Sequence, residues 1–201
     1  MSAGAAIPWS KAFDTASNLM DALSLACERI DIAGSIRRLK PYVHDIELVA
    51  IPLWETTDGG DLWGTSVDVD LLEGLVATLC SEGILRLREV ESHHQDGSTS
   101  TGYRNGEAFK ALEFAGIPVD LFIVRPPAEW GVIYAIRTGP GDWNQRLVTD
   151  CQKYLRRVDK GRVYRSGKPV PCPEEEDFFA AIGQEFLAPA ERRVEKVRIK
   201  P

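Results

Sequence analysis

Two carboxylates stand one residue apart at the start of an apolar segment, where an ordinary buried strand carries no charge. Asp45 and Glu47 open the segment DIELVAI, and Asp120 follows the first residue of a second segment, VDLFIV. Side chains two residues apart on a strand point to the same side, so Asp45 and Glu47 are expected to project together. Adjacent carboxylates repel unless a cation lies between them, and hard divalent ions prefer oxygen ligands. The three acidic residues are therefore candidate metal ligands, although an acidic pair taken in isolation is more often the solvent face of a half-buried strand.

A candidate phosphate-binding turn lies just upstream of the acidic pair. Gly34 and Ser35 lead into residues 36–40, which are expected to form one helical turn. The free N–H groups at the start of such a turn can hold phosphate, and glycine lets the backbone approach closely. Arg37 and Arg38 add cationic donors. A phosphate-binding turn and a pair of metal-binding carboxylates, about ten residues apart, together provide what phosphoryl transfer needs.

Hydrophobic periodicity predicts the elements that must position these residues. The sequence predicts a mixture of helices and strands, with Asp120 on a strand well after the one that carries Asp45 and Glu47. Helices are expected over residues 10–30, 69–82, 130–136, 144–155 and 173–186; strands over 31–33, 45–51, 84–91, 104–114 and 119–124; and loops or turns over 56–68, 93–101 and 167–169.

This order of elements indicates an α+β protein with a mixed sheet and flanking helices. Pro126-Pro127 marks a plausible boundary, because consecutive prolines interrupt regular structure. We therefore expect two subdomains, residues 1–126 and a smaller α/β subdomain at 127–201.

The bulk composition excludes some classes of protein. The chain has 201 residues, 44% of them hydrophobic and 27% charged, and no apolar stretch approaches the roughly 20 residues of a membrane helix. Its start lacks the pattern of a signal peptide, and its four cysteines form no CxxC pair, so we expect an intracellular protein with no membrane partner.

The net charge of −6 hides a basic segment between residues 153 and 168. Such a stripe is typical of phosphate contacts, and a solvated helix and loop is the alternative interpretation. The segment carries seven basic residues against the single acid Asp159: Lys153, Arg156, Arg157, Lys160, Arg162, Arg165 and Lys168.

These motifs, in this order, resemble the polymerase beta superfamily of nucleotidyltransferases, and more closely the family X DNA polymerases. The family's Gly-Ser, Arg-Arg and Asp-x-Asp pattern is similar to Gly34-Ser35-Ile36-Arg37-Arg38 followed by Asp45-Ile46-Glu47. Its third aspartate resembles Asp120, and its Thr-Gly turn with a following Asn resembles Thr138-Gly139 and Asn144. The C-terminal segments at 167–171, 174–179 and 189–193 are also similar, and the match runs from about residue 16 to residue 193.

The resemblance implies a nucleotidyltransferase palm over residues 1–126 and a C-terminal subdomain that binds nucleotide and DNA. Asp45, Glu47 and Asp120 would be catalytic and hold two Mg²⁺ ions, with Mn²⁺ as an alternative metal, and Asp120 would accept the proton of the attacking 3′-hydroxyl. The implied nucleotide-binding residues are Gly34, Ser35, Arg38, Thr138, Gly139 and Asn144. The implied DNA-binding residues are Arg146, Lys153, Arg156, Arg157, Arg162, Arg165 and Lys168.

Three departures from the family pattern qualify these implications. Glu47 stands where most members have Asp, and the longer side chain shifts the carboxylate relative to an octahedral metal. Ile136 and Arg137 replace an aromatic pair that screens out ribonucleotides, which implies loose sugar discrimination. Only 33 residues precede Gly34, so the N-terminal domains of large members are expected to be missing, as in the short viral and phage forms.

The functional expectation is a monomeric DNA polymerase that transfers nucleotides from dNTP to a primer–template, with gap filling as one role. Two alternatives stay open. The same chemistry could serve an untemplated transfer to RNA, protein or a small molecule, which would not require the C-terminal motifs or the basic stripe. A non-catalytic nucleic-acid-binding module is the other alternative, although loss of metal ligands usually marks such modules and all three carboxylates are present here.

Overall fold

A mixed five-strand sheet lies at the centre of the N-terminal half of the molecule. The computed structural model describes residues 6–59, 66–93 and 98–200. In the sheet order β2-β4-β11-β10-β7, only β4 and β11 are parallel neighbours, and all other pairs are antiparallel. The strands are β2 (Cys27–Ile32), β4 (Ile46–Pro52), β7 (Leu85–Leu87), β10 (Phe109–Phe114) and β11 (Ile117–Ile123). The protein is therefore an α+β protein, as the sequence predicts.

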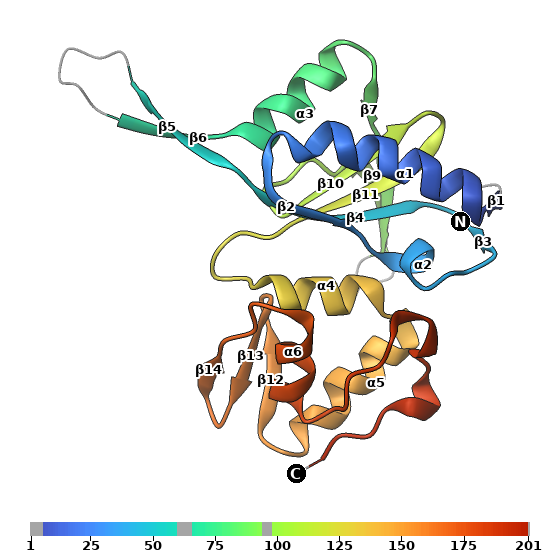
Figure 1. Cartoon of the computed structure of the whole chain (residues 1–201), viewed down its shortest axis with the longest axis vertical. Helices are drawn as coiled ribbons and strands as arrows, with labels where there is room; N and C mark the ends of the chain where they lie inside the picture. The colour runs from blue at the N-terminus through green and yellow to red at the C-terminus, as the bar shows by residue number, and fades with distance from the viewer. Residues whose placement is uncertain (1–5, 60–65, 94–97, 201) are drawn as a thin grey trace.

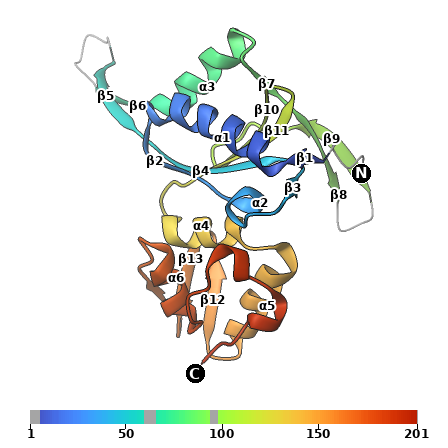
Figure 2. The ribbon, with the colours of Figure 1, turned by 45° about the vertical axis from the view of Figure 1, so that its right-hand side comes forward.

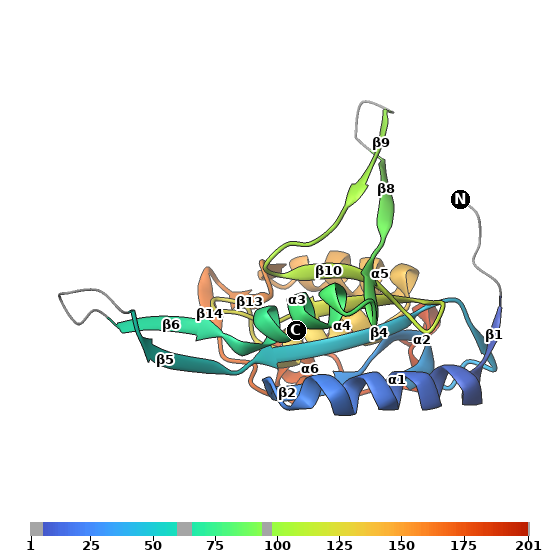
Figure 3. The ribbon, with the colours of Figure 1, turned by 90° about the horizontal axis from the view of Figure 1, so that it is seen from above.

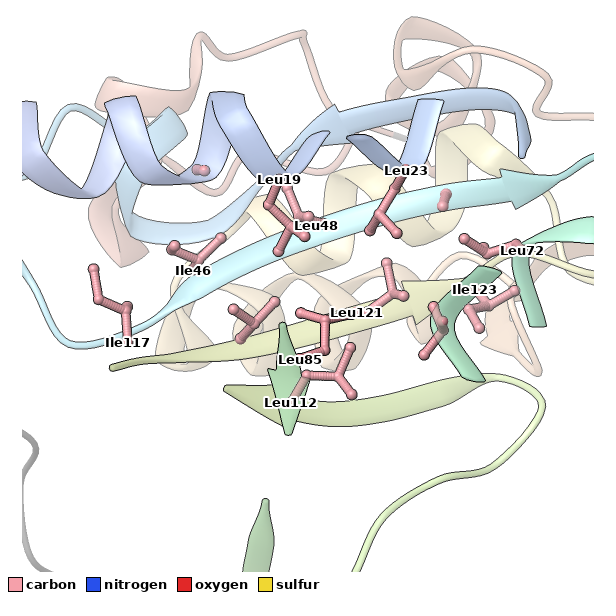
Figure 4. Packing of buried hydrophobic residues seen from close by; sticks show 14 of the residues in the cluster. Leu19, Leu23, Ile46, Leu48, Leu72, Leu85, Leu112, Ile117, Leu121 and Ile123 are labelled. Atoms are coloured by element: carbon pink, nitrogen blue, oxygen red, sulfur yellow. The ribbon is translucent and has the colours of Figure 1, made fainter. Parts of the chain in front are cut away.

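Two helices, α1 (Trp9–Ser24) and α3 (Leu71–Ser81), cover one face of this sheet (Figure 1). Leu19 and Leu23 of α1 pack on Leu48 of β4 and Leu121 of β11, and all of these side chains are buried (Figure 4). The side chains that alternate with them in β4 and β11 point to the opposite face. That opposite face is where Glu47 and Asp120 lie.

The helix α4 (Trp130–Thr138) runs beneath the second face of the sheet (Figure 2). Trp130 and Tyr134 of α4 form a separate buried cluster with Val49 of β4 and Phe122 of β11. Because both faces of β4 and β11 are covered, these strands are nearly continuous apolar runs, and a charged residue within them is conspicuous.

The C-terminal half has its own hydrophobic core. Trp143, Leu147, Phe178 and Phe179 are at most 1% exposed and pack with residues from α4 and the small sheet. The elements here are α5 (Gly141–Gln152), β12 (Arg156–Asp159), β13 (Arg162–Arg165), β14 (Lys168–Val170), α6 (Glu175–Ile182) and two 3-10 turns, Pro189–Glu191 and Val194–Lys196. This core contains no residue before the predicted boundary at Pro126-Pro127.

Ion pairs fasten the two halves together across α4. The Arg37 guanidinium, which also lies 3.9 Å from the Tyr134 ring centre, donates to both carboxylate oxygens of Glu175, at 2.9 and 2.7 Å. Arg192 approaches the same carboxylate at 2.8 Å, and Arg29 pairs with Glu174 at 2.8 Å. Arg37, placed by sequence beside a phosphate cradle, is therefore occupied in holding the halves together.

Two hairpins project from the body, and the sequence predicts neither. The prediction of a loop at 56–68 is wrong at both ends of this segment, because β5 (Trp54–Asp58) pairs with β6 (Ser66–Asp70). The middle of the segment, residues 60–65, lies outside the described residues. The polar segment 93–101 likewise contributes to β8 (Glu89–His93) and β9 (Thr99–Tyr103), apart from undescribed residues 94–97. Figure 3 shows both hairpins extending away from the sheet in different directions.

The remaining elements differ modestly from the predictions. The helices expected at 69–82, 144–155 and 173–186 are confirmed with different ends, and the expected strand at 84–91 is divided between β7 and β8. The helix expected at 10–30 ends at Ser24, and residues 27–30 belong to the strand β2, so this part of the prediction is wrong. The expected turn around Gly167 is confirmed, and β14 begins directly after it at Lys168. A short pair, β1 (Ile7–Pro8) with β3 (Tyr42–Val43), lies beside the start of α1. In the described part of the chain, no helix combines the length and apolar character needed to cross a membrane.

Candidate functional site

The parallel pairing of β4 and β11 places two of the candidate carboxylates side by side. Asp120 lies opposite Glu47 in the register, so their Cα atoms are about 4.8 Å apart. Asp45 immediately precedes β4 and is followed by Ile46, which is fully buried on the other face. Alternation places Glu47 and Asp120 on the α4 side of the sheet, and Asp45 lies close enough that its charge contributes to raising the pKa of both.

The turn that follows β2 packs directly against Glu47. This turn is the short helix α2 (Gly34–Arg37), and Gly34 has a φ of 61°. A Cβ atom added to Gly34 would lie 1.6 Å from Oε2 of Glu47, so no larger residue fits there without moving the carboxylate. The backbone N–H of Ser35 donates to the Glu47 carboxylate. The predicted phosphate cradle and the acidic pair are thus in contact, with one cradle donor engaged by Glu47.

Four residues lie side by side across the sheet, next to the α2 turn: Arg88, Ala111, Asp120 and Glu47. The N–H of Arg88 donates to the carbonyl of Ala111 at 2.9 Å, Ala111 lies opposite Asp120, and Asp120 lies opposite Glu47. The small Ala111 side chain lets the Arg88 guanidinium reach across it, and Nη2 of Arg88 donates to Oδ1 of Asp120 at 2.6 Å. Arg88 therefore neutralises one of the three candidate metal ligands.

The charge balance of the site is unfavourable for its carboxylates. Burial raises the pKa of Glu47 to about 7, and the negative charges of Asp45 and Asp120 add to the shift, which Arg38 opposes. Burial also raises the pKa of Asp120, although Arg88 counteracts this effect. A group of buried like charges of this kind is stabilised by any cation that enters it.

The donor set suits a hard divalent cation, but its arrangement is not that of a finished metal site. Within the described ranges, no group of three or more histidine, cysteine, aspartate or glutamate side chains is arranged to hold a metal ion. Instead, Asp120 is bonded to Arg88, and Glu47 accepts from the Ser35 N–H. Metal binding by these carboxylates would require Asp120 to exchange Arg88 for the ion.

The predicted nucleotide-binding residues Arg38, Thr138, Gly139 and Asn144 meet at the C-terminal end of α4. Arg38 donates to the Thr138 carbonyl at 2.5 Å. Thr138 is 0% exposed, and its hydroxyl accepts from Arg37. The Asn144 amide donates to the Gly139 carbonyl at 2.9 Å, and its Oδ1 is buried with no hydrogen-bond partner among the described residues. These residues bind each other around the turn, next to the carboxylates.

Ser35 and Arg38 retain some capacity to bind a ligand. The Ser35 hydroxyl and Nε of Arg38 are buried and lack a hydrogen-bond partner within the described part of the chain. Arg38 is also attracted by the charges of Glu47, Asp45 and Asp142, which oppose the lowering of its pKa by burial. A polyanion bound at this turn would supply acceptors for both side chains.

The predicted DNA-binding residues do not form one continuous surface. Residues that lie opposite each other in β12, β13 and β14 share a face, so Arg165 and Lys168 lie on one face of this sheet and Arg157 on the other. Arg162 lies 4.0 Å from Glu129. Arg157, Arg165 and Lys168 are exposed and could reach a phosphate backbone.

Arg156 differs from the other residues of the stripe because it is only 3% exposed. Its guanidinium donates to the carbonyls of Ile182 and Lys200, at 3.2 and 2.5 Å. The expectation that Arg156 binds DNA conflicts with this burial, because the side chain is committed to the protein interior.

Arg146 and Lys153 are exposed on α5 and just beyond it, where both interact with Asp150. Arg146 lies 2.5 Å and Lys153 2.7 Å from the Asp150 carboxylate, and these two cations lower the pKa of Asp150. The pairing is an ordinary surface arrangement, so both side chains remain accessible to another anion.

The sequence does not reveal two arginines that the fold brings to the carboxylates. Arg88 lies 32 residues from Asp120, within an alternating strand segment that resembles any solvent-facing strand. Arg137 is exposed, stacks on Phe122 with a guanidinium-to-ring distance of 3.9 Å, and is attracted by the charges of Glu47 and Asp120. No local pattern marks Arg88, and the sequence singles out Arg137 only because it replaces an aromatic residue. That either arginine lies near the carboxylates depends on strand order.

Compared with protein-family models and with curated proteins, this chain matches none. The arrangement of the carboxylates, the α2 turn and the surrounding arginines is therefore the basis on which a function can be argued.

Proposed function

We propose that this protein is a nucleotidyltransferase of the family X DNA polymerase type, which adds nucleotides from dNTP to the 3′-hydroxyl of a DNA primer, including primers at gaps. One observation carries the proposal: Glu47 and Asp120 are neighbours on parallel strands, and the Gly34-Ser35 turn packs on Glu47. This arrangement unites an acidic site with backbone donors suited to phosphate.

Asp45, Glu47 and Asp120 would hold Mg²⁺, or Mn²⁺ in its place, because three carboxylates offer the oxygen ligands that these ions prefer. The ions would supply charge neutralisation at the phosphates and at the attacking and leaving oxygens. Burial raises the pKa of Glu47, and the like charges of Asp45 and Asp120 add to the shift. Both effects support this role, because they disfavour the ionised acidic group at neutral pH when no cation is bound.

The protein's own residues would then perform the positioning and the proton transfer. Asp120 would accept the proton of the attacking hydroxyl at a carboxylate oxygen, and its raised pKa suits a general base. The α2 turn and Arg38 would bind the β and γ phosphates through the Ser35 hydroxyl and the unpaired donor of Arg38. Arg88 would have to release Asp120 before either role begins.

Ile136 and Arg137 would lie near the sugar of the incoming nucleotide, at the end of α4 that meets the carboxylates. Arg137 stacks on Phe122 and leaves no aromatic ring at this position to exclude a 2′-hydroxyl. We therefore propose that ribonucleotides are accepted with little discrimination.

A second candidate function keeps this chemistry and changes the acceptor to an RNA end, a protein side chain or a small molecule. The specific observation in its favour is the dispersal of the basic stripe, in which Arg156 is buried and Arg157 faces away from Arg165. A smaller acceptor would not require a continuous basic surface.

A primer extension assay tests the proposal and separates the two candidates. Wild-type protein with Mg²⁺ is given gapped, recessed and single-stranded DNA, each with dNTPs and with NTPs. We expect extension to be lost in Asp45→Asn and Asp120→Ala, since each removes a ligand worth several kcal/mol of charge stabilisation, about 10³-fold in rate.

The matched control is Asp21→Asn, an exposed aspartate on α1 on the far side of the sheet, which should extend DNA as wild type does. If wild-type protein extends DNA no better than the two site variants, the polymerase proposal is wrong. Efficient labelling of another acceptor, lost in the same variants, would establish the second candidate instead.

A further inference from the structure

A pocket of about 420 Å³ lies between the end of β11 and one side of α4, next to the carboxylate site. Its walls are largely apolar and include Phe122 of β11, Ile133 of α4, and Pro127 and Ala128 of the segment that connects them. The volume falls within the roughly 300–1,000 Å³ typical of small-molecule sites. The pocket is therefore large enough to take a ligand group with a flat apolar part.

The pocket adjoins the carboxylate site, although none of the three carboxylates lines it. Phe122 follows Asp120 by two residues, so both side chains point to the same face of β11. Arg137 follows Ile133 by one helical turn and lines the same pocket, while its charge is attracted by those of Glu47 and Asp120. A ligand in the pocket would have one end at Arg137, beside the carboxylates.

Cations outnumber acids around this pocket. Arg125, Arg137 and Lys160 line it, with Glu107 as the single acid. Arg125 is paired with Asp70, but Arg137 and Lys160 form no hydrogen bond or ion pair within the part of the chain that is described. Two unpaired cations at an apolar pocket favour a ligand that carries an anionic group.

The turn between β12 and β13 holds Lys160 at the pocket. Gly161 accepts a hydrogen bond from the N–H of Glu129 at 2.9 Å, which ties the turn to the start of α4. A Cβ atom on Gly161, whose φ is 72°, would lie 2.5 Å from Cβ of Ala128, so glycine is required for this close approach. The position of Lys160 is thus built into the fold, in contrast to that of a lysine on a free loop.

We propose that this pocket binds the terminal nucleotide of the acceptor strand. The base packs among the apolar walls beside Phe122 and Ile133, where Arg137, stacked on Phe122, adds a planar surface. The 5′-phosphate of that nucleotide contacts Lys160, and the 3′-hydroxyl points toward the Arg137 end, where Asp120 lies. The role as an acceptor site rests on the proposed function, whereas the binding of a nucleoside monophosphate does not.

The test is a titration of the metal-free protein with 5′-dAMP, followed by amide chemical shifts, with deoxyadenosine and inorganic phosphate as separate probes. We expect 5′-dAMP to shift the amide signals of Ala128, Ile133 and Gly161, and each partial probe to bind more weakly. Lys160→Glu should reduce the affinity for 5′-dAMP at least about tenfold, because it removes a hydrogen bond to a charged group. Ala128→Trp, which fills the pocket, should do the same.

The matched control is Lys11→Glu, an exposed lysine on α1 that should leave the affinity unchanged. Shifts confined to the α2 turn, or equal losses of affinity in Lys160→Glu and Lys11→Glu, would overturn the inference. The outcome is independent of catalysis: binding here with no loss of extension in Asp45→Asn and Asp120→Ala would reject the proposed function alone. Normal extension without 5′-dAMP binding here would reject the pocket alone.

Discussion

Two glutamates, one in each half of the molecule, have opposite surroundings. The Glu175 side chain is 5% exposed and lies between Arg37, at 2.7 Å, and the fully buried Arg192, at 2.8 Å. Glu47 is half-buried and forms no ion pair with any described residue, and its charged neighbours include Asp45 and Asp120. One carboxylate is surrounded by cations from the protein, and the other is placed among like charges.

This difference separates a structural site from a candidate functional one. Burial of a charge is tolerated when partners neutralise it, and the partners of Glu175 come from both halves, so its cluster holds them together. Three arginines lie near the Glu47 cluster, but among the described residues only Asp120 forms an ion pair, with Arg88, while Arg38 and Arg137 interact with the cluster without pairing with it. Asp45 and Glu47 are therefore open to an external cation. Each prediction below tests one side of this contrast.

The largest effect is expected at Glu175. The substitution Glu175→Gln leaves Arg37 and the fully buried Arg192 without their anionic partner, and breaking a buried pair in this way costs about 3–5 kcal/mol. Urea unfolding measures the loss. Glu176→Gln, an exposed neighbour on the same helix, should change the free energy of unfolding by no more than about 0.5 kcal/mol. Equal effects of the two substitutions would show that the Glu175 cluster does not join the halves.

Glu47 should behave in the opposite way in metal-free protein. Its pKa is raised to about 7, so the folded protein binds this proton more tightly than the unfolded chain does. Below its ordinary pKa of 4.5, Glu47 is protonated in both the folded and the unfolded state and does not lower stability. As the pH rises from 4.5 to about 7, the unfolded chain releases the proton first, so the free energy of unfolding falls. Glu47→Gln removes this cost, roughly 3 kcal/mol at pH 8 and little at pH 4.

Unfolding by urea in the presence of a chelator, at pH 4 and at pH 8, measures this difference between Glu47→Gln and wild type. The isosteric amide keeps the space beside Gly34 filled, so a change in packing should contribute equally at both pH values. A stabilisation that is the same at pH 4 and pH 8 would contradict the electrostatic explanation.

A smaller effect is expected at Arg88, the one arginine that pairs with the acidic group. Arg88→Met removes the cation that competes with a metal ion for Asp120, so the affinity for Mn²⁺ should rise. We expect an increase of about tenfold, or about 1.4 kcal/mol, because this is the energy of one hydrogen bond to a charged group. Calorimetric titration of the metal measures this change. Arg86→Met, at an exposed position on β7 two residues before Arg88, is the control. Unchanged or weaker binding in Arg88→Met would mean that Arg88 does not compete with the metal.

The central strands of the fold could be predicted from the sequence because they are long apolar runs. The expected strands at 45–51 and 119–124 correspond to β4 and β11 within about two residues, and the common face of Glu47 and Asp120 follows from their alternation. Their adjacency does not follow, because strand order depends on packing across the whole sheet.

The elements and partners that the sequence did not predict depend on contacts between distant segments. The β5–β6 hairpin and the β12–β14 sheet are short strands rich in polar and charged residues, whose strand structure depends on cross-strand pairing. Arg37 was expected to serve phosphate binding, but its partner Glu175 lies 138 residues away. A local motif identifies a side chain's chemistry and cannot reveal a competing partner that the fold supplies.

The most direct test of the central claim is Mn²⁺ binding, followed by electron paramagnetic resonance, to wild type, Asp45→Asn, Asp120→Asn and Glu175→Gln. If the acidic group beside α2 is the cation site, wild-type protein binds Mn²⁺ and each aspartate variant binds it at least about tenfold more weakly. Glu175→Gln, assayed where it remains folded, keeps the wild-type affinity. Equal affinities in wild type and both aspartate variants would contradict the account.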